Sequence, residues 1–249
     1  MPVIGLSIVI QILCAVHCVR NSRNSLWLMV IIFLSIPGCF AYAIFEILPA
    51  YSGSRQVRIA KTVAMKKLDP EREVRTARQA VELADTAANR GALADALFGV
   101  GSYKEAAEHF RFALAKMPGP DRGTQFKLAR AELEAGNARA ARRILEELPE
   151  SGSPSENDRA RLLLARTLQE CGERDRALEL YAEVGARLPG GEAQCRRAAI
   201  LLENGREAEA EEDLVEVERL VKRLDRLERI QHRDMYDWAA RTLAELRAR

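Results

Sequence analysis

Two arginines, Arg130 and Arg166, are the residues whose type and spacing best suit recognition of a charged partner. If they lie on one surface, their guanidinium groups can hold a carboxylate or an acidic peptide through paired hydrogen bonds. The alternative is that each arginine pairs with the acid four residues further along an exposed helix, Glu134 or Glu170. Such exposed pairs are common and stabilise a helix by only about 0.3–0.5 kcal/mol each. The residues alone leave both interpretations open.

A second group of chemically capable side chains is Cys14, His17 and Cys18, whose spacing places them on one face of a helix. Thiols and imidazole are ligands that zinc and copper prefer. A structural zinc site normally needs four ligands, so packing is the favoured interpretation and no metal is expected. The sequence contains no phosphate-binding loop, no G-x-S-x-G elbow and no nucleophile beside a base. It therefore predicts a protein that is not an enzyme and needs no cofactor.

The charged residues divide the chain into two parts of different character. The 249 residues include 38 Lys and Arg and 36 Asp and Glu, which give a net charge of +2. This balance argues against a nucleic-acid partner, because nucleic-acid-binding domains are strongly basic. Only three charged residues, Arg20, Arg23 and Glu46, precede Tyr51. The remainder carries nearly all of the charge and is long enough to form a folded domain.

Two apolar runs occupy the first part of the chain, at residues 3–19 and 26–48. A membrane-spanning helix needs about 20 apolar residues, so these runs predict a transmembrane hairpin over residues 1–50. A basic juxtamembrane linker, residues 51–70, is expected to follow it and to contact the lipid bilayer. The cations of this linker are Arg55, Arg58, Lys61, Lys66 and Lys67. Because cytoplasmic flanks carry the excess of Lys and Arg, the pattern predicts a multi-pass inner-membrane protein whose remaining part is cytoplasmic.

The second apolar run carries a resemblance to a known anchor. Asn24-Ser25-Leu26-Trp27 is followed by an apolar stretch, by Pro37-Gly38 and by Tyr42. This segment resembles the two-helix membrane anchor at the amino terminus of phospholipase D-type proteins such as cardiolipin synthases. The catalytic His-x-Lys motif of that superfamily is absent, so the resemblance implies an anchor without the activity. It also suggests an alternative function, a non-catalytic accessory factor of phospholipid metabolism or envelope biogenesis that acts through its membrane hairpin.

An internal repeat organises the rest of the chain. Gly101, Gly136, Gly172 and Gly205 recur at nearly equal intervals, and each precedes an alanine by five positions and a large apolar residue by nine. This pattern resembles the tetratricopeptide repeat, a pair of antiparallel helices that recurs with a period of about 34 residues. It predicts an all-α fold in which the transmembrane hairpin is followed by an α-solenoid over residues 71–249. The repeats are expected at about residues 87–120, 122–149, 158–190 and 191–219, followed by capping helices.

The first helix of each repeat is predicted to line a concave surface that binds a protein or peptide. These helices are expected at residues 89–100, 123–135, 158–171 and 192–204. The inward-facing residues would be Asp95, Phe98, Phe126, Arg130, Leu133, Arg159, Leu162, Arg166 and Gln169, with Cys195, Ala199 and Leu202 in the fourth repeat. The sequence therefore predicts a membrane-anchored interaction scaffold whose groove recruits or positions a partner.

Both ends of the solenoid need covering, because a terminal helix would otherwise expose its apolar face. A lid is expected over residues 71–88. At the other end, a long helix from residue 207 and a closing helix from about residue 233 carry apolar residues at helical spacing. Capping is the simpler interpretation of these C-terminal helices, and self-association through them is the alternative.

Overall fold

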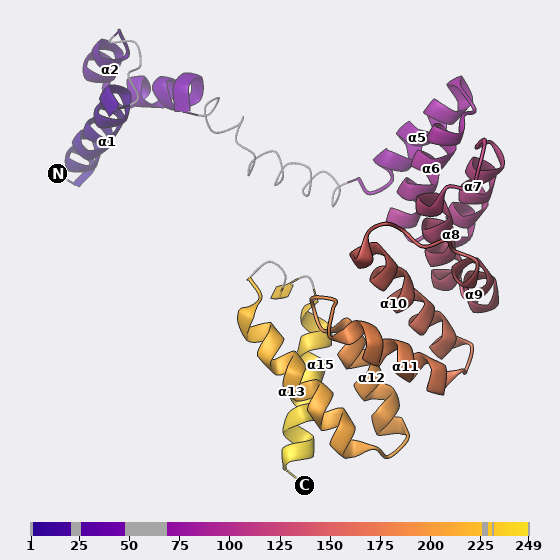
Figure 1. Cartoon of the computed structure of the whole chain (residues 1–249). Coiled ribbons are helices and arrows are strands. Elements are labelled where there is room, and N and C mark those ends of the chain that lie inside the picture. Colours follow the sequence, from indigo (N-terminus) through magenta and orange to yellow (C-terminus); the bar gives the residue numbers. More distant parts are fainter. Residues whose placement is uncertain (1, 21–25, 48–68, 226–228, 231, 249) are drawn as a thin grey trace. The chain divides into compact units, whose positions relative to one another are not determined.

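The computed structural model describes residues 2–20, 26–47, 69–225, 229–230 and 232–248. The regular secondary structure of these residues is entirely helical. The chain divides into two compact units, Met1–Arg72 and Glu73–Arg249 (Figure 1). Among the described residues, the first unit has one apolar cluster, and the second has three.

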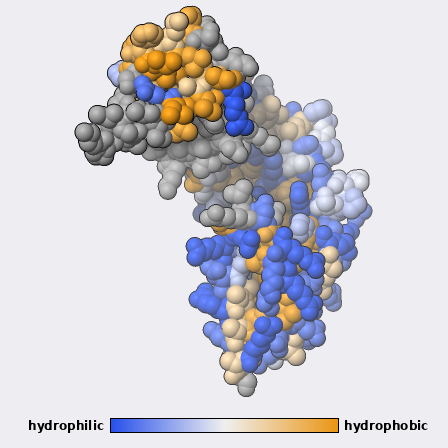
Figure 2. Space-filling view, turned by 90° about the vertical axis from the view of Figure 1, so that its left-hand side faces the viewer, coloured by the Kyte–Doolittle hydropathy of each residue, from blue (hydrophilic) through white to orange (hydrophobic). Residues whose placement is uncertain are grey.

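The first unit contains α1 (Pro2–Arg20), α2 (Leu26–Tyr42) and a short π-helix, η1 (Ala43–Ile47). Its two long helices pack around four buried residues, Cys18, Ile31, Cys39 and Tyr42. The Tyr42 hydroxyl and His17 Nδ1 are 3.0 Å apart and join α2 to α1. Other apolar side chains of this unit stay exposed, and they form the large orange area of Figure 2.

The transmembrane prediction for this unit is wrong. None of the described helices is both long enough and apolar enough to cross a membrane. The run at residues 26–48 does not form one straight helix, because its α-helical part ends at Tyr42 after 17 residues. Gly38 also lies against Val30. A β-carbon at position 38 would overlap the carbonyl oxygen of Val30. Residues eight apart in a straight helix are separated by about 12 Å, so α2 is bent.

The predicted multi-pass localisation at the inner membrane is corrected accordingly. The alternative function in phospholipid metabolism loses its basis as well, since it depended on the membrane hairpin. The cations expected to contact lipid lie outside the described residues; these are Arg55, Arg58, Lys61, Lys66 and Lys67.

The second unit is a stack of antiparallel helix pairs (Figure 1). The pairs are α6 (Ala87–Gly99) with α7 (Tyr103–Ala115), α8 (Arg122–Glu134) with α9 (Ala138–Glu146), α10 (Pro154–Glu170) with α11 (Arg174–Gly185), and α12 (Glu192–Glu203) with α13 (Glu207–Arg223). Before them comes α5 (Arg72–Leu83), and after them comes α15 (Arg233–Arg247). The prediction of an all-α helical-repeat fold is confirmed.

The residues that marked the repeat in the sequence also explain its packing. In the turn of each pair, a glycine adopts φ between +72° and +84°, a conformation that other residues rarely adopt. An alanine with no exposed surface lets the paired helices approach closely; these are Ala106, Ala141, Ala177 and Ala210. The large apolar residue one turn later is buried in every pair, as Phe110, Leu145, Tyr181 and Leu214. Apolar clusters therefore follow one another along the stack.

One helix boundary differs from the sequence-based expectation, whereas the closing helix of the stack begins where it was expected. The helix α10 begins at Pro154, four residues earlier than expected, because proline is well suited to the first turn of a helix. At the end of the stack, α15 packs on α13 and α12 through Tyr236, Ala239 and Leu243. The Tyr236 hydroxyl also donates a 2.9 Å hydrogen bond to the Gly190 carbonyl. The C-terminal helices thus cap the stack within a single chain.

Candidate protein-binding groove

The first helices of the four pairs, α6, α8, α10 and α12, share a surface that we call the groove face. Ion pairs join these helices one after another. Lys127 Nζ of α8 lies 2.7 Å from the Asp95 carboxylate of α6. Arg166 Nη2 of α10 lies 3.0 Å from Glu134 of α8, and its Nε lies 3.8 Å from Glu192 of α12. These alternating charges form a ladder that crosses the whole series of first helices.

The ladder changes the interpretation of Arg166. Its guanidinium group contacts Glu134 and Glu192 on the two neighbouring first helices, and not Glu170 on its own helix. The side chain is only 23% exposed. Since Arg166 already contacts two carboxylates, its role within the chain is to hold adjacent repeats in register.

Arg130 is held in a different way. Its guanidinium carbon lies 4.7 Å from the centre of the Phe98 ring. The Phe98 and Tyr103 rings pack edge to face, with their centres 5.1 Å apart. A stacked guanidinium is attracted to the ring by about 0.5–1 kcal/mol and keeps its N–H groups available at its edge. Arg130 is exposed and forms no salt bridge with any residue that the structure describes. It is therefore an oriented cation whose charge is not compensated.

The other predicted groove residues differ in how accessible they are. Arg159 is exposed, stands two turns before Arg166 on α10, and makes no salt bridge within the described ranges. Phe126 and Leu162 are half-buried and supply apolar surface between the charges. Leu133 is buried and belongs to the core. Gln169 is half-buried, and its side-chain oxygen accepts a 2.8 Å hydrogen bond from the Tyr181 hydroxyl.

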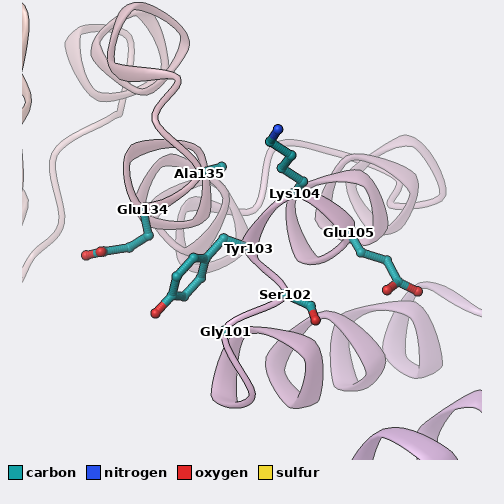
Figure 3. Close-up of a pocket in the computed structure, with 7 residues that line it drawn as sticks. All are labelled: Gly101, Ser102, Tyr103, Lys104, Glu105, Glu134 and Ala135. Carbon is teal, nitrogen blue, oxygen red and sulfur yellow. The ribbon is translucent and has the colours of Figure 1, made fainter.

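A hollow of about 420 Å³ adjoins the ladder between the α6–α7 turn and the carboxyl end of α8 (Figure 3). Its lining residues are Gly101, Ser102, Tyr103, Lys104, Glu105, Glu134 and Ala135. Figure 3 shows Tyr103 and Glu134 pointing to the same side, whereas Glu105 points away from them. Tyr103 supports Phe98 and Glu134 binds Arg166, so the hollow extends the groove face beside its charged residues.

Buried acids fix the helices that carry the groove face. Glu132 is 1% exposed and accepts hydrogen bonds from Arg111 of α7 and, at 2.9 Å, from Asn137. The Asp158 carboxylate accepts hydrogen bonds from Arg187 at 2.8–3.1 Å, and this guanidinium group lowers the pKa of Asp158. Removing the arginine of such a pair would leave a buried carboxylate without its charged partner. These buried pairs join the helices that carry the groove face.

The remaining candidate, the cluster of Cys14, His17 and Cys18, does not form a recognisable metal site. No set of three or more ligating side chains converges anywhere in the described part of the chain. Cys18 is buried in the core of the first unit, and His17 contacts Tyr42.

Sequence reasoning missed the partners that complete the ladder, Lys127, Glu134 and Glu192. A signal for two of the contacts was present, because Lys127 and Asp95 are 32 residues apart and so are Arg166 and Glu134. Opposite charges separated by nearly one repeat length on first helices are expected to meet across adjacent repeats.

Comparison with known proteins supports the repeat assignment. Residues 97–156 match a family model described as tetratricopeptide repeat. No curated protein matches the chain. Among solved structures, MamA (residues 41 to the end) from Desulfovibrio magneticus RS-1 has a TM-score of 0.55 at 15% identity, over 69% of this chain and 98% of that chain. YrrB, a TPR protein with an unusual peptide-binding site, has a TM-score of 0.50 at 19% identity, over 69% of this chain and 87% of that chain.

These findings concern the second unit, and they give no support to the resemblance between residues 1–50 and a phospholipase D-type anchor. Tetratricopeptide repeat proteins are typically non-catalytic scaffolds. The matched segment assigns a tetratricopeptide repeat to residues 97–156, and the helix pairs and the structural similarity show an all-α helical-repeat fold of this kind.

Proposed function

We propose that the chain is a non-catalytic interaction scaffold whose groove face binds an acidic segment of a partner protein. The observation that carries the proposal is the state of Arg130, which is exposed, oriented by the Phe98 ring and without a salt bridge among the described residues. Such a cation loses little conformational freedom when it binds a carboxylate, because stacking already restricts it. Arg159 supplies a second uncompensated cation on the neighbouring first helix.

The ladder supports the same proposal in another way. The pairs of Lys127 with Asp95 and of Arg166 with Glu134 neutralise charges on either side of Arg130. An acidic segment would therefore meet a positive centre without strong repulsion from nearby acids. The fold also suits a peptide partner, since YrrB has a similar fold and its structure is described as having a peptide-binding site.

The test uses a library of random peptides displayed on phage. Peptides that bind are selected separately on the full chain and on two double variants. The groove variant is Arg130→Ala/Arg159→Ala. The control variant is Arg139→Ala/Arg143→Ala on α9, which removes the same charge from two exposed arginines that make no salt bridge in the part of the chain described.

We expect acidic peptides to be enriched on the wild type and on the control variant. The groove variant should bind them about tenfold more weakly for each arginine lost, because a hydrogen bond to a charged group contributes about 1.5 kcal/mol. Equal enrichment on all three proteins, or enrichment without an acidic bias, would refute the proposal.

A further inference from the structure

A second hollow, of about 480 Å³, lies where the groove face meets the capping helix α15. Its apolar surface comes from Cys195 and Ala199 of α12 and from Met235 and Trp238 of α15. A volume of this size is within the range of small-ligand pockets, about 300–1,000 Å³, and accommodates a large side chain. Sequence reasoning placed Cys195 and Ala199 on the groove, but it treated α15 only as a cap.

The position of α15 makes this hollow a preformed feature. Tyr236, Ala239 and Leu243 face the core and fix the helix, and the Tyr236 hydroxyl binds the Gly190 carbonyl. Met235 and Trp238 are three residues apart and therefore share another face of α15. Both are partly buried and both line the hollow. The cap thus supplies an aromatic wall to the end of the groove.

The floor of the hollow carries no charge at neutral pH. Cys195 is 3% exposed, and burial raises the pKa of its thiol to about 12. Ala199 beside it has no polar side-chain atom. An apolar floor next to a tryptophan favours an apolar side chain over a polar one.

The rim of the hollow, in contrast, offers hydrogen-bond donors. Arg196 Nε donates to Glu192 at 2.9 Å, and its two terminal nitrogens make no hydrogen bond or ion pair within the described residues. Glu192 balances the charge of Arg196, which leaves the terminal N–H groups of Arg196 as the donors that the rim offers. The side-chain oxygen of Gln169 already accepts a hydrogen bond from the Tyr181 hydroxyl.

We propose that this hollow binds a large apolar side chain of the partner segment, with a carboxylate next to it held by Arg196. The inference rests on the proposed function, because it extends the same groove, and it adds a sequence requirement: the acidic segment contains an apolar anchor, such as leucine, methionine or phenylalanine. The apolar floor receives the anchor, and the terminal N–H groups of Arg196 receive the neighbouring carboxylate. An acidic segment without an anchor would bind through Arg130 and Arg159 alone.

The experiment uses the same displayed library and further variants of the full chain. Ala199→Leu fills the hollow from α12, and Ala240→Leu adds the same volume at an exposed position of α15 outside it. Trp238→Ala removes the aromatic wall and serves as an independent variant. Far-UV circular dichroism verifies that all variants are folded. Selected peptides are then synthesised with capped ends, each also with alanine in place of its apolar residue, and titrated.

We expect acidic peptides with one apolar residue to bind Ala199→Leu and Trp238→Ala about tenfold more weakly than the wild type, and Ala240→Leu equally well. Alanine in place of the anchor should weaken binding to the wild type but not to Ala199→Leu, since the two changes remove the same contact. If acidic peptides depend on Arg130 and Arg159 but are indifferent to Ala199→Leu, the pocket inference fails and the proposed function stands. If no selected peptide depends on those arginines, the proposed function itself fails.

Discussion

Asp213 of α13 is predicted to make stability depend on pH in a direction that is unusual for an acid. Its Oδ1 accepts a 2.9 Å hydrogen bond from Arg197, whereas its buried Oδ2 has no hydrogen-bond partner among the described residues. Burial raises the pKa of Asp213 to about 6 despite the opposing effect of Arg197. The folded chain therefore keeps a proton on this group over a pH range in which the unfolded chain has lost it.

The sign and size of the effect follow from proton linkage. Between about pH 4 and pH 6 the folded state binds more protons than the unfolded state, so the contribution of Asp213 to stability falls as pH rises. A shift of about two pKa units corresponds to nearly 3 kcal/mol. We take this figure as an upper limit and expect about 1–2 kcal/mol. Asp213→Asn removes the titration, so the wild type should lose this amount relative to the variant between pH 4 and pH 7.5.

The assay is urea denaturation at a series of pH values, followed by the fluorescence of Trp238 with Trp27→Phe in every protein. The difference in free energy of unfolding between wild type and Asp213→Asn is plotted against pH, which cancels the titration of all other groups. Asp175→Asn, at an exposed position of α11, is the control and should show no such trend. A difference that is constant or that rises with pH would refute the reasoning.

Three further predictions concern stability and are measured by the same denaturation assay. Gly136→Ala should destabilise the chain by about 1–2 kcal/mol, because the backbone φ at this position is +84°. A β-carbon there would meet no neighbouring atom, so the cost comes from the backbone alone. Gly91→Ala, within α6, should instead stabilise the chain by about 0.5–1 kcal/mol. Arg111→Ala should cost about 2 kcal/mol by leaving the buried Glu132 carboxylate without its charged partner, and Arg111→Lys should cost less. Tyr181→Phe should cost about 1 kcal/mol, since it deprives Gln169 of its donor. Unchanged stability in any of these variants would contradict the role given to that residue.

The repeat could be predicted from the sequence because its signals are local. The spacing of Gly101, Ala106 and Phe110 recurs in every helix pair. The glycine makes a turn with positive φ, the alanine allows a close approach, and the large apolar residue fills the core. The groove face followed from the same register. The spacing placed Arg130 and Arg166 on equivalent helices, but it did not show that one stacks on Phe98 while the other joins Glu134 and Glu192. Those contacts depend on the distance between neighbouring repeats, which no single repeat contains.

The apolar beginning of the chain, residues 1–50, shows the opposite case. The two apolar runs predict membrane spans, because length and hydropathy are the main sequence signals for a membrane helix. The bend of α2 depends on Gly38 lying against Val30, and the change to a π-helix follows Tyr42. Similarly, Trp238 was assigned to the cap, because apolar residues on a closing helix do not reveal which of them face the core and which line a hollow.

The central claim, that the groove face binds an acidic segment, is tested most directly by calorimetric titration of the peptide most enriched on the wild type. The account predicts that Arg130→Ala/Arg159→Ala weakens binding at least tenfold, that Arg139→Ala/Arg143→Ala changes it less than twofold, and that the affinity falls with added salt. Equal weakening by the two double variants would show only a general effect of charge and would contradict the account, as would binding that neither variant alters.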